Sequence, residues 1–169
     1  VAIFVALSKL KKRSSLEDIF LKGYQKNSDV LEGIDTLIKE IKDIYPYGSK
    51  GYDFLIGTPL KRDKEGNIKL KGNSPYKRYN MFLRWMVRKD NIDMGLWKQV
   101  LPKDLILPLD THTFAVSKKL LLLKRNVYDL TAAIEVTEKL KKFDINDPIK
   151  YDFALYRIGQ ESIVKSMDL

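Results

Sequence analysis

The sequence contains no cysteine among its 169 residues. Without thiols the chain cannot form disulfides, thiolate metal sites or cysteine-ligated iron–sulfur clusters, and no cysteine can serve as a nucleophile. A chain that needs no disulfides is typical of a reducing compartment, so we expect a cytoplasmic location. Any chemistry that the protein performs must come from other side chains.

Histidine is nearly absent as well, because His112 is the only one. A Ser-His-Asp triad would have to use it, and no G-x-S-x-G motif supplies the nucleophile. One histidine with scattered carboxylates lacks the spacing of a zinc site, and no Walker or G-x-G-x-x-G loop is present to hold nucleotide phosphates. We therefore expect no metal and no cofactor, and we interpret His112 as a local hydrogen-bonding residue near a helix start.

Long apolar runs are also missing. The opening "VAIFVAL" has seven apolar residues, which is too few to cross a bilayer, and neither a basic region nor a cleavage site marks it as a signal peptide. The sequence therefore predicts a buried helix here and no membrane partner. Because the chain begins without Met, we expect a preceding segment that covers this helix.

Positive charge, by contrast, is abundant and concentrated. The formal net charge is +9, and residues 61–89 carry ten Lys or Arg against two acids, which is 10 − 2 = +8. A charge run of this kind is either a solvated face or a surface that binds a polyanion. Composition alone does not decide between the two.

Helical periodicity dominates the sequence and predicts an all-α protein. The chain is long enough for one compact domain, which we expect to have two lobes, residues 1–100 and 107–169. The only strand signal is a short β-hairpin within 60–72, turning at Glu65-Gly66-Asn67. The predicted helices cover residues 2–10, 16–24, 29–45, 75–89, 94–100, 111–121, 128–142 and 149–158. Their expected capping residues in the second half are Ser74 with Pro75, Asp110, Asn126, and Asp147 with Pro148.

Two residues of this pattern are candidates for a role in a chemical reaction. Lys77 falls in the first turn of a predicted helix, where unpaired backbone N–H groups and the helix dipole disfavour a cation. Neighbouring arginines act in the same direction, and together these effects favour the neutral amine, which is the nucleophilic form of lysine. Asp110 lies at a helix start, where a carboxylate is stabilised as the anion. The residue types alone also allow plainer interpretations, an exposed lysine and a simple helix cap.

The segment "PLDTHTFAVSKKLLLL" resembles the one in which the helix-hairpin-helix base-excision DNA glycosylases carry their catalytic Asp. The segment "SPYKRYNMFLRW" resembles the lysine-bearing hairpin helix of the 8-oxoguanine glycosylase branches of that superfamily. "DPIKYDFALYRIGQ" resembles the last helix of that fold. Together the three segments look like an uncharacterised bacterial family related to these enzymes, and they cover about half of the chain, residues 72–160.

The resemblance implies a two-lobed helix-hairpin-helix DNA glycosylase-like fold and an enzyme acting on damaged double-stranded DNA in the bacterial cytosol or nucleoid. Lys77 would attack the anomeric carbon of a flipped nucleoside, and Asp110 would accept its proton or stabilise the transition state. The product would be a Schiff base, which permits strand cleavage. The excised base would be an oxidised purine such as 8-oxoguanine, and the enzyme would be a monomer without cofactor or iron–sulfur cluster.

The same resemblance assigns the remaining candidate residues. The expected phosphate-binding residues are Lys71, Arg78, Arg84, Arg88 and Lys118, and Thr111 and His112 would support the start of the helix after Asp110. The expected base-stacking residues are Trp85, Tyr151 and Phe153. For Trp85 and Phe153 the alternative is packing in the core.

The hairpin departs from the family pattern, because Gly72 and Pro75 stand where the L-P-G-x-G-x-K motif has its glycines. We therefore expect an altered backbone clasp for phosphate. Two other functions remain open from the sequence. One is a non-catalytic nucleic-acid-binding helical module, and the other is a protein-interaction domain whose basic face meets an acidic protein.

Overall fold

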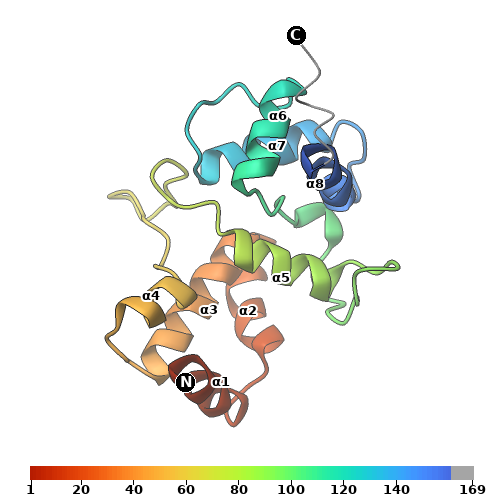
Figure 1. Ribbon diagram of the computed structural model, residues 1–169. Helices are drawn as coiled ribbons and strands as arrows, with labels where there is room; N and C mark the ends of the chain where they lie inside the picture. The colour runs from red at the N-terminus through yellow and green to blue at the C-terminus, as the bar shows by residue number, and fades with distance from the viewer. Residues whose placement is uncertain (161–169) are drawn as a thin grey trace. The chain divides into compact units, whose positions relative to one another are not determined.

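The computed structural model describes residues 1–160 (Figure 1). Within these residues the secondary structure is entirely helical, which confirms the predicted all-α class. The α-helices are α1 Ala2–Lys11, α2 Leu16–Tyr24, α3 Val30–Ile44, α4 Lys50–Ile56, α5 Lys77–Val87, α6 Thr111–Lys119, α7 Leu130–Leu140 and α8 Asp152–Gln160, with the 3-10 helices η1 Pro102–Asp104 and η2 Pro148–Tyr151. No described helix is long and apolar enough to cross a membrane.

The chain divides into two compact units, Val1–Ile68 and a second unit that begins at Lys69. This division differs from the expected lobes, which grouped residues 1–100. The helix that carries Lys77 therefore belongs to the same unit as Asp110. The second unit alone contains the residues from which the site is built.

The first unit packs α1 to α4 around a core centred on α2 and α3. Ser15 begins α2 with a reciprocal capping box, in which its side chain accepts a hydrogen bond from the N–H of Asp18 at 3.0 Å. The ring of Phe20 is fully buried, and a Cβ on Gly33 of α3 would meet it at 2.4 Å. The glycine thus permits the close approach of the two helices.

A fourth helix in this unit was not predicted. Residues 46–59 contain three glycines and two prolines and no predicted helix covers them, but α4 forms there because the Ser49 side chain accepts a hydrogen bond from the N–H of Tyr52 at 3.2 Å. Tyr52 and Ile56 are both buried. Burial of one apolar face therefore outweighs the local glycine content.

The predicted β-hairpin is wrong as a strand assignment. Residues 61–68 turn tightly, with Gly66 at φ +88° and the Asp63 N–H donating to the carbonyl of Asn67 at 2.9 Å. In this turn only Arg62 and Ile68 pair, as an isolated antiparallel bridge, and the described residues contain no β-strand. The turn chemistry was recognised, but too few residues pair for a strand to form.

The second unit packs α6 against α8, and α7 against η2, around an extended segment that precedes α6 (Figure 1). This segment, residues 105–109, is buried throughout, and Leu107 and Leu109 are fully so. It ends at Asp110, which caps α6 as predicted. The apolar "LILPL" run therefore carries the chain through the core and delivers a carboxylate at its end.

Four helix predictions in the second unit are corrected. The helix α5 begins at Lys77 rather than at Pro75, because Tyr76 precedes it in the left-handed region at φ +48°. The helix α7 begins behind Asp129, whose side chain accepts a hydrogen bond from the N–H of Ala132, and not behind Asn126. Residues 94–100 form no helix at all. The last predicted helix is interrupted, because Pro148–Tyr151 is a 3-10 turn before α8 begins.

Candidate active site

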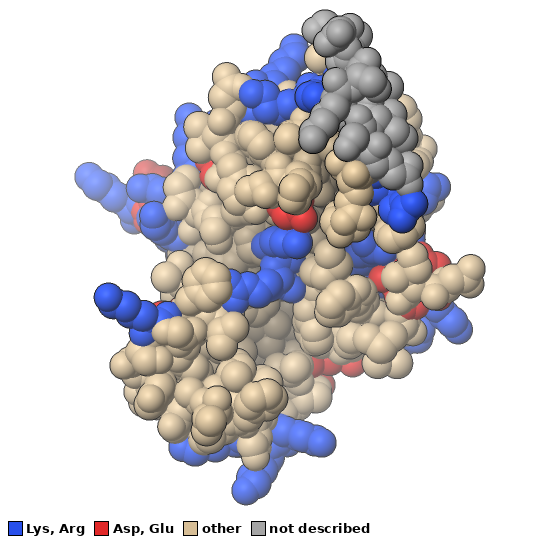
Figure 2. Space-filling view, in the orientation of Figure 1, with Lys and Arg blue, Asp and Glu red and all other residues tan. Residues whose placement is uncertain are grey.

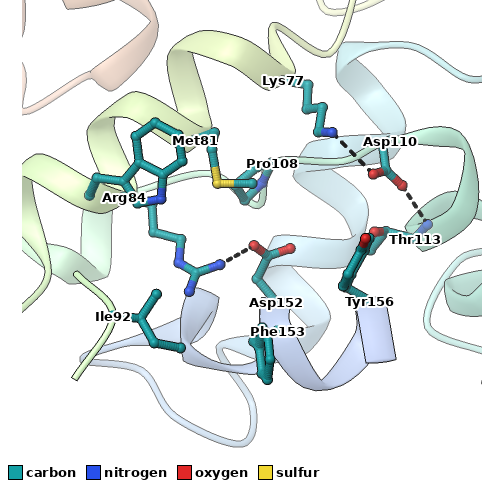
Figure 3. A pocket seen from close by; sticks show the side chains of 11 residues that line it. Lys77, Met81, Arg84, Ile92, Pro108, Asp110, Thr113, Asp152, Phe153 and Tyr156 are labelled. Carbon is teal, nitrogen blue, oxygen red and sulfur yellow. Dashed lines mark hydrogen bonds and ion pairs between the residues drawn. The ribbon is translucent and has the colours of Figure 1, made fainter. Parts of the chain in front are cut away.

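Lys77 and Asp110 meet within the second unit. Lys77 is the first residue of α5, and its Nζ atom lies 3.2 Å from Oδ2 of Asp110 (Figure 3). The other carboxylate oxygen, Oδ1, accepts a hydrogen bond from the backbone N–H of Thr113 at 2.8 Å. One oxygen of Asp110 thus caps α6 and the other faces the amine.

The environment of Asp110 keeps its carboxylate ionised. Burial acts to raise the pKa of Asp110, but the hydrogen bond from the Thr113 N–H and the contact with Lys77 outweigh it, so the pKa lies below its usual value. The side chain of Asp110 is 18% exposed and that of Lys77 is 43% exposed. The amine is therefore accessible from solvent, while its partner is fixed in the wall behind it.

Both residues line a pocket of about 330 Å³. Its walls combine the apolar side chains Met81, Ile92 and Pro108 with three aromatic rings, those of Trp85, Phe153 and Tyr156 (Figure 3). The size is within the range of sites that hold a small organic group. The lining therefore brings aromatic side chains into the same space as the amine and the carboxylate.

The aromatic predictions have mixed outcomes. Trp85 is 43% exposed and Phe153 is 49% exposed, and both line the pocket, so the alternative of core packing is wrong for these two. Tyr151 does not line it. Its ring instead packs edge-to-face against Phe143, with centroids 6.2 Å apart, under the amine of Lys150.

Arg84 does not have the predicted phosphate-binding role. It is only 5% exposed, and its guanidinium pairs with Asp93 through Nε at 3.1 Å and with Asp152 through Nη1. A guanidinium that is buried and already bonded to two carboxylates cannot reach a phosphate without breaking those pairs. Arg84 instead lines the pocket and holds Asp152, another lining residue, through an ion pair.

The predicted phosphate-binding role of Arg88 is wrong for the same reason. It is 6% exposed and pairs with Asp147 through Nε at 2.8 Å, with Asp90 through Nη1 at 2.8 Å, and also with Asp93. The pairs tie the end of α5 to the turn before η2 and to the loop that follows α5. Arg84 and Arg88 follow Lys77 by seven and eleven residues, a spacing that puts all three on one side of a helix. Lys77 is exposed at the start of that side, whereas Arg84 and Arg88 are buried towards its end.

The other predicted contact residues lie outside the pocket. Lys71 and Arg78 are exposed, and Lys118 is half-buried with its amine donating to Asn126. They remain on the surface of a strongly basic chain, where blue Lys and Arg side chains outnumber red Asp and Glu side chains on the face in Figure 2. Their role in phosphate binding stays a prediction.

Thr111 and His112 form the exposed first turn of α6, and neither lines the pocket. The helix-start contact to Asp110 is supplied by the N–H of Thr113 instead. Among residues 1–160 there is no group of three or more His, Cys, Asp or Glu side chains arranged to hold a metal ion.

Sequence reasoning missed Asp152, the second carboxyl of the pocket. It is the first residue of α8 and is 4% exposed. Burial raises the pKa of Asp152, and the contacts with Arg84 only partly oppose this. The available signal was an acid in the otherwise apolar and aromatic "YDFALY" stretch, where a buried carboxyl needs a partner.

Comparison with known proteins identifies a family. The model of a family described as "Protein of unknown function (DUF2400)" matches residues 1–161, which is nearly the whole chain. No curated protein and no solved structure matches. The family description states no activity, so the function is argued from the pocket.

Proposed function

We propose that this chain, which belongs to the DUF2400 family, is a DNA-repair glycosylase with lyase activity that removes an oxidised purine such as 8-oxoguanine. The observation that supports it most is the pairing of the Lys77 amine with the Asp110 carboxylate at 3.2 Å in a pocket walled by aromatic rings. In this proposal the protein acts on double-stranded DNA as a monomer in the cytoplasm, and the chemistry needs no cofactor.

Lys77 supplies the nucleophile. In its neutral form the amine attacks the anomeric carbon of a flipped nucleoside, and the resulting adduct opens to a Schiff base. The exposed fraction of the side chain, 43%, leaves room for a sugar to approach. A Schiff base at this carbon permits strand cleavage by β-elimination, which is the lyase activity of the proposal.

Asp110 serves the same step in two ways. Its Oδ2 atom is within reach of the amine and can accept a proton from it. Its lowered pKa keeps the group anionic at neutral pH, which suits stabilisation of the positive charge that develops on the sugar. The Thr113 N–H fixes the carboxylate, so little reorganisation is needed as the charge forms.

The rings of Trp85, Phe153 and Tyr156 provide faces on which a flipped base can stack. Flipping costs a few kcal/mol, and least for a damaged or mispaired base, so the step itself contributes selectivity. Lys71, Arg78 and Lys118 are the remaining candidates for phosphate contacts. Arg84 and Arg88 have no part in this role, because their charges are satisfied internally.

Borohydride trapping on duplex DNA that carries an abasic site or 8-oxoguanine tests the proposal. Reduction converts a Schiff base into a stable protein–DNA adduct, which is seen as a shifted band on a denaturing gel. We expect an adduct with the wild-type chain and none with Lys77→Ala. Lys103→Ala is the matched control, because Lys103 is an exposed lysine of the same unit outside the pocket. It should trap as the wild type does.

An adduct that persists in Lys77→Ala would remove Lys77 from the role. No adduct together with tight, salt-dependent DNA binding would favour a non-catalytic nucleic-acid-binding module. Weak binding without salt dependence would favour a protein-interaction domain. A panel of duplexes with different damaged bases then identifies the lesion.

A further inference from the structure

The second carboxyl of the pocket, Asp152, has one oxygen that the protein leaves open. Its side chain is 6% exposed, and Oδ2 accepts a hydrogen bond from Nη1 of Arg84. Within residues 1–160 no hydrogen bond reaches Oδ1. Figure 3 shows the carboxyl group rising from the start of α8 into the pocket, on the side of Pro108. This oxygen is therefore available to a group that enters the pocket.

The charge balance around Asp152 favours a proton on it. Arg84 and Arg88 are two guanidinium groups, but together they contact four carboxyl groups, those of Asp90, Asp93, Asp147 and Asp152. If all four were ionised, the cluster would carry 2 − 4 = −2. A buried excess of negative charge is costly and is relieved by protonation of a buried carboxyl.

Among the four carboxyl groups, Asp152 is the one best placed to hold that proton. The side chains of Asp90 and Asp147 are 37% and 27% exposed, so water stabilises their charges. Asp93 is buried but contacts both guanidinium groups. Asp152 contacts only Arg84 and also faces the negative charge of Asp110, and burial raises its pKa.

We propose that Asp152 is the proton donor to the departing base. The assignment rests on the proposed glycosylase function and adds a second acid to the pocket that holds the lysine and its carboxylate partner. Arg84 holds Oδ2, so the proton is carried on Oδ1, the oxygen to which no described protein group is bonded. Protonation of the base as it leaves is needed because the nitrogen otherwise departs with a full negative charge.

Displacement of the base starts from a neutral Lys77 amine, an ionised Asp110 and a protonated Asp152. The bond between C1′ and the base nitrogen breaks, and its electron pair goes to the base, which receives the proton from Oδ1 of Asp152. The lone pair of Lys77 Nζ forms the new bond to C1′, and the extra proton on that nitrogen goes to Asp110. The base leaves neutral, and solvent restores the proton on Asp152.

The test uses two reactions of the full chain that differ in one respect. Excision of 8-oxoguanine placed opposite cytosine requires a base to leave, whereas borohydride trapping on an abasic duplex does not. We expect Asp152→Asn to lower the single-turnover excision rate by at least about a hundredfold, the usual contribution of a general acid, and to leave abasic trapping within about twofold. The pH dependence gives an independent readout. The wild-type excision rate should fall on the alkaline side as Asp152 loses its proton, and this fall should be absent in Asp152→Asn.

The groups that face Asp152 in this titration are Arg84 and Lys77 from α5 and Asp110 from the start of α6. Asp93→Asn is the matched control, because Asp93 contacts the same Arg84 but does not line the pocket. It should keep an alkaline fall, moved to lower pH because the cluster then holds one negative charge fewer. Thermal melting of each variant verifies that it is folded.

An excision rate or an alkaline fall that is unchanged in Asp152→Asn overturns the assignment. So does an equal loss of excision and abasic trapping, because a proton donor to the base has no task on abasic DNA. The proposed function fails by a different result, namely no Lys77-dependent adduct with the wild-type chain on abasic DNA.

Discussion

The carboxylate of Asp110 divides its two oxygens between two tasks. Oδ1 accepts the Thr113 N–H at 2.8 Å and begins α6, while Oδ2 lies 3.2 Å from the amine of Lys77. The two residues are 33 positions apart in the sequence, and both lie at helix starts. Because the cap uses only one oxygen, the stability of α6 and the chemistry of the pocket can be separated by substitution.

Asp110→Asn should separate them. The amide oxygen of Asn still accepts the Thr113 N–H, and Asn is as good an N-cap as Asp, so the free energy of unfolding should change by less than about 0.5 kcal/mol. The charge opposite Lys77 is lost, and we expect excision to fall at least about a hundredfold. Asp110→Ala should lose the cap as well, at a cost of about 1 kcal/mol.

Urea unfolding and single-turnover excision measured on the same preparations provide the comparison. Equal activity of Asp110→Asn and the wild type would mean that Asp110 is only a helix cap. A large loss of stability in Asp110→Asn would mean that the ion pair with Lys77 is mainly structural.

The parts of the fold that depend on residues close together in the sequence were predictable. Periodicity placed most helices, and the Asp110 cap was found because an N-cap depends on a side chain and a backbone N–H three residues away. The left-handed Tyr76 was not found, because nothing in the residue type favours that conformation. Its position is imposed by packing, since Tyr76 is 6% exposed.

The site was predictable for the Lys77 and Asp110 pair but not for its supporting residues. Arg84 and Arg88 share a helix face with Lys77 in the sequence pattern, yet whether a charge is exposed depends on which acids the fold brings to it. Asp152 lies 68 positions after Arg84, and no local pattern joins them. Pairs of this kind depend on tertiary structure, so sequence periodicity does not report them.

Arg88→Ala should be strongly destabilising. Arg88 has a side chain only 7% exposed and contacts three carboxylates, and its removal leaves the fully buried Asp93 with one cation instead of two. Breaking a buried ion pair typically costs about 3–5 kcal/mol. Urea unfolding should show this loss, whereas Lys89→Ala, at the exposed neighbouring position, should stay within about 0.5 kcal/mol. Similar stability of both variants would contradict the structural role of Arg88.

Lys71 should affect DNA binding without affecting stability. Its side chain is exposed, so Lys71→Ala should leave the free energy of unfolding almost unchanged. If the amine contacts a phosphate, the slope of log K against log salt for duplex DNA should fall by about 1. Lys71→Arg keeps the charge and should keep the slope. Fluorescence anisotropy at several salt concentrations measures both, and an unchanged slope in Lys71→Ala would remove Lys71 from the interface.

Asp35 in the first unit should stabilise the protein at neutral pH. Its carboxylate accepts hydrogen bonds from the Leu60 N–H at 2.8 Å, from Lys39 at 2.7 Å and from Arg62 at 2.8 Å. Burial acts to raise the pKa of Asp35, but these three partners outweigh it and hold the pKa below its usual value. A lowered pKa in the folded state means stability that is present above the unfolded pKa of about 3.9 and is lost as the pH falls through the folded pKa.

We therefore expect Asp35→Asn to be less stable than the wild type at pH 7, with a difference that shrinks as the pH falls below about 4. Asp53→Asn is the matched control, because Asp53 pairs with Lys42 on the surface with 54% of its side chain exposed. That pair should contribute less than about 1 kcal/mol. Thermal melts between pH 3 and pH 7, over roughly the range in which carboxylates titrate, compare the three proteins. A difference for Asp35→Asn that does not depend on pH would contradict the role of its charge.

Asp152→Asn should change stability at pH 7 in the opposite direction from Asp35→Asn. The folded protein raises the pKa of Asp152, because burial opposes its charge more than Arg84 supports it. A carboxyl with a raised folded pKa destabilises the native state at any pH above its unfolded pKa, since the unfolded chain ionises more easily. Asn cannot ionise, so Asp152→Asn should melt at a higher temperature than the wild type at pH 7, and the gain should vanish below about pH 4, where both states of the wild type are protonated. Higher stability combined with lost excision would identify Asp152 as a residue kept for chemistry at the expense of stability. A lower melting temperature at pH 7 would instead make its pairing with Arg84 a structural contact.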